Sequence, residues 1–145
     1  GCNLSFAGLK TAILKISKKL TNKKEKYNLA ASFQKTINEI LYQKTKVAFE
    51  EFLKNKKLKD NVFVIAGGVA SNVSIRENLI KLCREKKFKP IFPPINLCSD
   101  NAAMIAWAGI ERFKINLTNN LKFPSKARWP LDLDAPFLKG PGIKL

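Results

Sequence analysis

A pair of glycines stands at the end of an apolar, β-branched run in residues 62–72, Val-Phe-Val-Ile-Ala-Gly-Gly-Val-Ala-Ser-Asn. The run Val62–Ala66 is typical of a strand that is buried on both faces. Gly67 and Gly68 then stand at the carboxyl edge of the predicted sheet, where open α/β folds bind their ligands. Because glycine has no side chain, the backbone there can adopt positive φ and come close to a ligand. The predicted helix that follows presents unpaired N–H groups and a positive dipole end, which favours a nucleotide.

Two interpretations of this segment stay open on local grounds. Ser71 and Asn72 can hydrogen-bond a ribose, a phosphate or a base. Alternatively, Gly67–Gly68 forms a tight turn and Asn72 only caps the next helix. The segment lacks the Gly-Lys-Ser/Thr ending of a P-loop, and it is not a G-x-G-x-x-G motif. Taken alone, it favours the structural turn.

Asp100 is a second candidate, because it precedes a run of small and apolar residues that predicts a helix. A carboxylate in this position commonly stabilises the helix dipole or caps the helix. Ser99 is also suited to the cap, which would leave Asp100 to point into a cleft as a ligand for a hard metal ion. A third segment, Ser5–Thr11, is locally no more than a strand-to-helix turn with a surface lysine.

The elements that must position these residues alternate between strand and helix, which predicts an α/β fold with an at least partly parallel sheet. Strands are predicted at Asn3–Ala7, Val62–Ala66 and Ile91–Phe92. Helices are predicted from the turn at Gly8–Thr11 to Leu20, from Asn28 to the basic stretch Lys54–Lys59, at Asn72–Lys86 and from about Ser99 to Phe113. The inward face of the third helix would carry Ile75, Leu79, Ile80 and Leu82, and small residues of the fourth would line a close-packed face. Beyond Asn116 we expect coil, with a docking segment at Arg128-Trp129-Pro130.

Composition limits the chemistry that this chain can perform alone. The sequence has no His, so neither a His-based triad nor a His metal site can be completed. Cys2, Cys83 and Cys98 lack metal-binding spacing and indicate a reduced, cytoplasmic protein. No run approaches the roughly 18 apolar residues of a transmembrane helix, so no membrane is expected. The net charge of +16 would attract RNA. Lys far outnumbers Arg, however, and an AT-rich coding sequence would produce the same bias.

Five segments, taken in order, resemble the TsaD family of tRNA N6-adenosine threonylcarbamoyltransferases, formerly called glycoproteases or O-sialoglycoprotein endopeptidases. They are Ser-Phe-Ala-Gly-Leu-Lys-Thr (5–11), Ala-Ala-Ser-Phe-Gln (30–34), Ala-Gly-Gly-Val-Ala-Ser-Asn (66–72), Pro-Pro-Ile-Asn-Leu-Cys-Ser-Asp-Asn-Ala-Ala-Met-Ile-Ala (93–106) and Arg-Trp-Pro-Leu-Asp (128–132). The resemblance is to the C-terminal half of the family and covers essentially the whole chain. It makes the nucleotide interpretation of Gly67, Gly68 and Asn72 the favoured one.

The resemblance implies one lobe of an actin-like ATPase fold (ASKHA, ribonuclease H-like), with a mixed sheet flanked by helices. That lobe would occupy residues 1–116, and residues 117–145 would form an extended docking tail. The implied reaction moves a threonylcarbamoyl group from threonylcarbamoyl-AMP to N6 of the adenosine 3′ of the anticodon in tRNAs that read ANN codons. Asn72, Gly67 and Gly68 would bind ATP or the adenylate, and Asp100 would bind a divalent metal, iron as Fe²⁺. No residue stands out as a general base, so no catalytic residue is predicted.

Two metal-binding histidines of the family lie in its first lobe, which this chain lacks. The metal would therefore be shared with that N-terminal lobe, and the isolated chain is expected to be inactive. Expected partners are tRNA, the missing N-terminal lobe and, in a bacterium, TsaB- and TsaE-type proteins. The alternative is a non-catalytic remnant with the same fold that binds a nucleotide or a partner. A sugar-kinase-like relative is disfavoured by Ser-Asp-Asn-Ala-Ala (99–103), and a peptidase by the absence of a nucleophile–His pair or a zinc motif.

Overall fold

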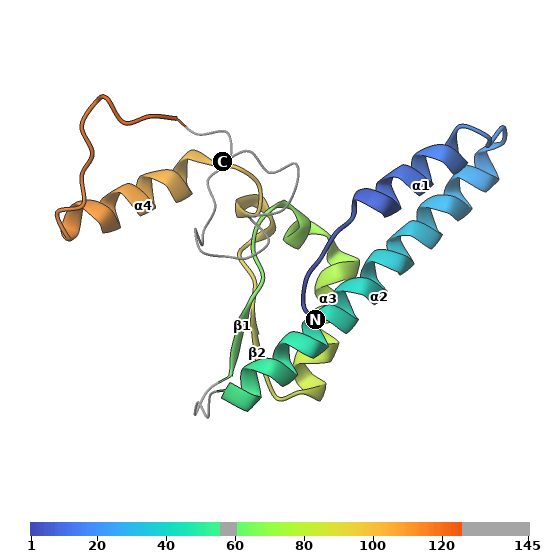
Figure 1. Cartoon of the computed structure of the whole chain (residues 1–145), viewed down its shortest axis with the longest axis horizontal. Coiled ribbons are helices and arrows are strands. Elements are labelled where there is room, and N and C mark those ends of the chain that lie inside the picture. Colours follow the sequence, from blue (N-terminus) through green and yellow to red (C-terminus); the bar gives the residue numbers. More distant parts are fainter. Residues whose placement is uncertain (56–60, 126–145) are drawn as a thin grey trace. The chain divides into compact units, whose positions relative to one another are not determined.

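The computed structural model describes residues 1–55 and 61–125, and the chain divides into two compact units, Gly1–Asn101 and Ala102–Leu145 (Figure 1). The first unit contains two helices, then a strand, a helix and a second strand. The elements are α1 (Ala7–Ser17), α2 (Lys23–Asn55), β1 (Val62–Val64), η1 (a 3₁₀ helix, Gly68–Ser71), α3 (Val73–Glu85), β2 (Lys89–Ile91) and η2 (a 3₁₀ helix, Ile95–Leu97), with α4 (Ala102–Lys114) in the second unit.

The strands β1 and β2 form a small parallel sheet, with Val62 opposite Lys89 and Val64 opposite Ile91. Parallel neighbours need a crossover connection, and α3 supplies it. The α/β class predicted from the sequence is confirmed in this coarse form, a helix-rich chain with a parallel strand pair.

The core of the first unit lies where α2 and α3 meet the sheet. Leu82 and Cys83 of α3 are fully buried and cluster with Phe49 of α2 and with Phe88. The rings of Phe49 and Phe88 stack with centroids 3.8 Å apart, and Phe63 of β1 meets Phe49 edge-on at 4.9 Å. The edge-on pair of Phe63 and Phe49 has the geometry that adds stability beyond the area that it buries. The C-terminal part of α2 is thereby fixed against β1 and α3.

The helix α3 follows the sequence prediction closely. It begins directly after Asn72 and ends at Glu85, and Ile75, Leu79 and Leu82 are buried as predicted. Ile80 is only half-buried. The apolar spacing of three and four residues therefore identified the buried face of this helix.

The strand predicted at Asn3–Ala7 is wrong, because the chain has no regular element before α1 begins at Ala7. A strand this short is stable only when it pairs with a neighbour. Within residues 1–55 and 61–125, the sheet consists of β1 and β2 alone. Leu4 and Phe6 line a cleft instead.

The helix α2 begins earlier than the predicted start at Asn28. Asn22 caps it, since its side-chain Oδ1 accepts a hydrogen bond from the backbone N–H of Glu25 at 2.8 Å. Residues 23–27, which the prediction placed outside a helix, therefore belong to α2. Lysine is a good helix former, so a run of lysines does not end a helix.

The expectation that β1 is buried on both faces is wrong for the described residues. The side chains of Val62 and Val64 are 43% and 60% exposed, whereas Phe63 between them packs against the core. The two valines share one face of the strand, because side chains alternate along it. That face is only partly covered in the part of the chain that the structure describes.

In the second unit, α4 begins at Ala102, later than the predicted start near Ser99, and none of its residues is buried in the described structure. The close-packed face predicted for its small residues is therefore not found there. The predicted docking segment Arg128–Pro130 lies outside the described residues, and the domain limits 1–116 and 117–145 stay predictions. Among the helices described, none is both long enough and apolar enough to cross a bilayer.

Candidate functional site

An open cleft of about 710 Å³ separates α2 from the turn that contains the glycine pair. This volume lies within the range of small-molecule binding sites. The lining comes from the N-terminal segment, α2, η1 and the start of α3, and it consists of Leu4, Phe6, Phe33, Gln34, Ile37, Leu41, Gly68, Val69, Ser71, Asn72 and Ile75. Most of these side chains are apolar, three of them carry an amide or a hydroxyl group, and none is ionisable. The cleft suits a ligand part that is flat, apolar on its faces and uncharged.

The glycine turn, Gly67–Ser71, needs glycine at its first position. Gly67 has φ of 84° and ψ of 176°, a combination that essentially only glycine adopts. Its carbonyl accepts a hydrogen bond from the N–H of Ala70 at 2.9 Å, which closes η1. The hydroxyl of Ser71 donates to the carbonyl of Gly68 at 2.7 Å. Gly67 therefore shapes the turn, while Gly68 lines the cleft.

Asn72 acts as a cap and also lines the cleft. Its Oδ1 accepts a hydrogen bond from the N–H of Ile75 at 3.1 Å, which caps α3. Its Nδ2 donates to Oε1 of Gln34 at 2.8 Å. An amide has two N–H groups and two lone pairs, so one of each is left for a ligand. The structural and the functional interpretation of this asparagine are thus compatible.

A chain of amide hydrogen bonds joins α2 to the start of α3 and holds Asn72 in place. Gln34 accepts from Asn72, and its Nε2 donates to Oδ1 of Asn38 at 3.0 Å. Asn38 in turn donates from Nδ2 to the hydroxyl of Ser74 at 2.8 Å. Sequence reasoning missed the role of Gln34 and Asn38, and the available signal was their spacing of four residues on one helix face.

Arg76 ties the glycine turn to the residues that follow β2. Its Nε donates to the carbonyl of Ala70, and its Nη2 donates to the carbonyl of Pro93 at 2.7 Å. The same Nη2 lies 3.1 Å from the sulfur of Cys98. The guanidinium carbon stands 4.8 Å from the centre of the Phe92 ring, a cation–π contact. Sequence reasoning also missed this residue, one of only four arginines in the chain.

Asp100 is exposed and does not line the cleft. Because α4 begins at Ala102, Ser99 does not directly precede the helix, and the argument that Ser99 leaves Asp100 free loses its basis. Within the described residues, no three His, Cys, Asp or Glu side chains come close enough to hold a metal ion. A metal site normally needs several ligands, so these residues do not form one by themselves.

Two groups with shifted pKa values, Tyr42 and Cys83, lie away from the cleft. The hydrogen bond from Tyr42 to Glu85 raises the pKa of the phenol above its ordinary value. Burial raises the pKa of the Cys83 thiol. Neither residue lines the cleft, whose side chains carry no acid or base. The described part of the site is therefore equipped for binding rather than for proton transfer.

Residues 1–107 match the model of a protein family described as TsaD, tRNA N6-adenosine threonylcarbamoyltransferase. The chain belongs to this family. It is 64% identical over 145 residues to the tRNA N6-adenosine threonylcarbamoyltransferase of Pelagibacter ubique, a match that covers 100% of the chain and 41% of that relative. It is 42% identical over 142 residues to the enzyme of the same name from Zymomonas mobilis, covering 98% of the chain and 38% of the relative.

These matches confirm the predicted resemblance to TsaD. The chain corresponds, however, to less than the half of a family member that was predicted. A third relative of the same name, from Ruegeria sp. strain TM1040, is 40% identical over 149 residues and is likewise covered to 40% of its length. The chain thus spans about two-fifths of the length of the curated relatives that it matches.

Proposed function

We propose that this chain is the part of a tRNA N6-adenosine threonylcarbamoyltransferase that binds the nucleoside end of the adenylate substrate. The observation that carries the proposal is the uncharged cleft with an amide group from Asn72 at its wall. A purine has flat apolar faces and hydrogen-bonding edges, which match apolar walls and a few fixed polar groups. Cationic side chains commonly bind phosphate groups, and the lining of this cleft has none, so we assign the cleft to the nucleoside rather than to the phosphates.

In this proposal, the glycine turn and Asn72 contribute position rather than bond-making groups. Gly68 lets the backbone approach the nucleoside, and Asn72 offers it one N–H and one lone pair. The whole enzyme would then join the threonylcarbamoyl carbon to N6 of the adenosine 3′ of the anticodon in tRNAs that read ANN codons. The bond from that carbon to the phosphate oxygen breaks, AMP leaves, and N6 loses a proton. Holding the two reactants in line accelerates such a transfer.

The remaining parts of the proposed enzyme lie outside this chain. An N-terminal lobe of an actin-like fold would complete the nucleotide site, and Asp100 would supply at most one ligand to a divalent metal shared with it. TsaB- and TsaE-type proteins are proposed as further partners, and the cytoplasm as the location. The isolated chain is accordingly expected to show no transferase activity. Turnover by the isolated chain at a rate close to that of the full-length enzyme would contradict this.

Replacing Asn72 with serine tests the binding role separately from the capping role. Serine is as good an N-cap as asparagine, but it has no amide N–H. In the full-length enzyme, we expect Asn72→Ser to weaken binding of AMP by about fivefold, which corresponds to one hydrogen bond of about 1 kcal/mol. The midpoint of urea unfolding should fall less for Asn72→Ser, which loses only the bond to Gln34, than for Asn72→Ala, which also loses the cap. Unchanged AMP affinity in the serine variant, measured by calorimetry, would leave Asn72 as a cap only.

The same calorimetric titration with AMP distinguishes the proposed adenylate-binding role from the alternative, a non-catalytic remnant that no longer binds a nucleotide. A remnant that only contacts a protein partner would bind AMP no better than an unrelated basic protein does. Binding of AMP that depends on Asn72 favours the adenylate site, because it links the affinity to the cleft itself.

A further inference from the structure

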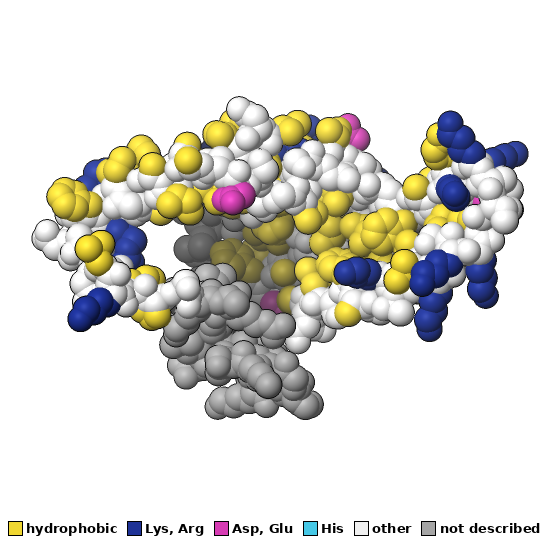
Figure 2. Space-filling view, turned by 90° about the horizontal axis from the view of Figure 1, so that it is seen from above, with side chains coloured by type: hydrophobic (Ala, Val, Ile, Leu, Met, Phe, Trp, Pro, Cys, Tyr) yellow, Lys and Arg dark blue, Asp and Glu magenta, His cyan; other side chains and the backbone are white. Residues whose placement is uncertain are grey.

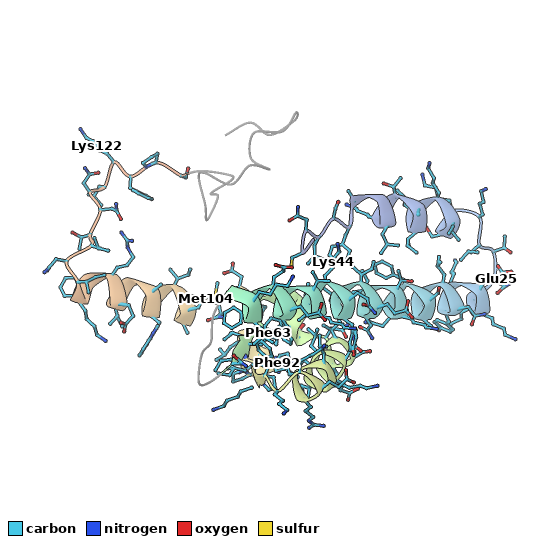
Figure 3. All side chains as sticks on the ribbon, turned by 60° about the horizontal axis from the view of Figure 1, so that its bottom comes forward. Glu25, Lys44, Phe63, Phe92, Met104 and Lys122 are labelled. Carbon is cyan, nitrogen blue, oxygen red and sulfur yellow. The ribbon has the colours of Figure 1, made fainter. Side chains whose placement is uncertain are left out.

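Six exposed lysines gather where α1 ends and α2 begins, and we name this surface the lysine tip. Its members are Lys15, Lys18, Lys19, Lys23, Lys24 and Lys26. They fill half of residues 15–26, a stretch whose one acidic residue is Glu25. Figure 2 shows basic side chains crowded over this end of the helix pair. In Figure 3, Glu25 marks the end of α2 that lies opposite to Phe63 and the core.

The lysines of this tip lack the glutamate partners that three other lysines of the first unit have. Lys35, Lys54 and Lys86 each form an ion pair with a glutamate. Within the described residues, none of the six tip lysines forms an ion pair. Coding bias explains an excess of lysine along the whole chain, but it does not explain why half of residues 15–26 are lysine. Like charges gathered in this way repel one another, and a bound polyanion relieves the repulsion.

The tip is a folded surface with a fixed base. Asn22 caps α2 within it, and apolar side chains from both helices, among them Ile13, Leu20 and Leu29, face one another below the lysines. The N-terminus of α2 adds its positive dipole end to the same place. A partner therefore meets an array of charges that is already assembled on two helices.

We propose that the lysine tip binds the phosphodiester backbone of tRNA. This inference rests on the proposed function, which makes tRNA a substrate, and it assigns a surface to that substrate. Lysine is a point charge on a flexible stem, suited to phosphates rather than to planar, two-pronged recognition. Backbone contacts set position without reading sequence. Such contacts fit an enzyme that must accept several tRNAs of different sequence.

The test compares two triple variants of the full-length enzyme that each remove three positive charges. The tip variant carries Lys18→Gln, Lys19→Gln and Lys23→Gln, and the matched control carries Lys35→Gln, Lys54→Gln and Lys86→Gln. Glutamine has nearly the helix propensity of lysine, so both variants should keep the fold. Binding of tRNA is measured by fluorescence anisotropy at several KCl concentrations. Each phosphate contact contributes roughly 0.7–0.9 to the slope of log K against log salt.

We expect the tip variant to lose about 2–3 from that slope, and the control to lose much less. If the wild-type enzyme and the tip variant bind tRNA equally at about 1 M salt, the tip variant binds about 100-fold more weakly at about 0.15 M. Equal slopes in both variants would overturn the assignment. So would a tip variant that keeps its tRNA slope and instead loses an acidic protein partner. A wild-type enzyme that does not bind tRNA would overturn the proposed function itself, whereas failure of the tip alone leaves the adenylate site standing.

Discussion

Replacing Gly67 with alanine tests whether the glycine turn needs its first glycine for backbone conformation or for space. At both Gly67 and Gly68, an added Cβ would meet no heavy atom within 4 Å. The two positions differ in the backbone, because Gly67 has φ of 84° with ψ of 176°, whereas the φ of Gly68 is not positive. Any difference between the two alanine variants therefore reports conformational strain and not a clash.

The two alanine variants should change the free energy of unfolding in different directions. Alanine at Gly67 must enter a region of φ and ψ that is essentially reserved for glycine, which costs about 1–3 kcal/mol. Alanine at Gly68 meets neither strain nor contact, and it reduces the entropy of the unfolded chain. The free energy of unfolding should then stay unchanged or rise by about 0.4–1 kcal/mol.

Urea unfolding followed by far-UV circular dichroism measures both variants. With an m-value of about 1–3 kcal/mol/M, a loss of 2 kcal/mol lowers the midpoint by roughly 1 M. A Gly67→Ala variant with the wild-type midpoint would refute the argument from backbone conformation. Equal losses in both variants would also refute it, since they would point to the space around the turn.

Three further predictions concern residues outside the cleft lining. Arg76→Met should lower the free energy of unfolding by about 2–4 kcal/mol, because it removes charged hydrogen bonds to two carbonyls. The control Arg84→Met replaces an exposed arginine and should change that free energy by no more than about 0.5 kcal/mol. Equal urea midpoints in the two variants would contradict this. Cys2 should react with Ellman's reagent at once, and Cys83 only after unfolding, since its thiol is buried with a raised pKa; rapid modification of both would show otherwise. The raised pKa of Tyr42 means that its bond to Glu85 stabilises the fold below about pH 10 and is lost as the phenol ionises at higher pH. The difference in unfolding midpoint between wild type and Tyr42→Phe should therefore shrink above pH 10, and a constant difference would count against the bond.

Local signals account for what could be predicted from the sequence. Asn72 and the spacing of Ile75, Leu79 and Leu82 specify the start and the buried face of α3 without reference to the rest of the chain. The turn at Gly67 was likewise predictable, because positive φ after a strand is a local requirement that glycine meets. The family resemblance then identified the class of ligand that such a turn serves.

Long-range contacts account for what was missed. Gln34 and Asn72 are 38 residues apart in the sequence, and Arg76 and Pro93 are 17 residues apart. No short sequence motif therefore predicts either hydrogen bond. The exposure of Val64 depends on what lies on the two faces of the sheet, which apolar composition does not specify. The short strand predicted near Leu4 failed for the same reason, since pairing is a property of two segments.

The contacts of Arg76 have a mechanical consequence for two parts of the molecule. A guanidinium is planar and its N–H directions are fixed, so the carbonyls of Ala70 and Pro93 are held at one spacing. Neither carbonyl can shift alone without bending a charged hydrogen bond. The glycine turn and the segment that leads through Cys98 to Asp100 are thereby mechanically coupled. A displacement of one of these segments would therefore be transmitted to the other through the side chain of Arg76.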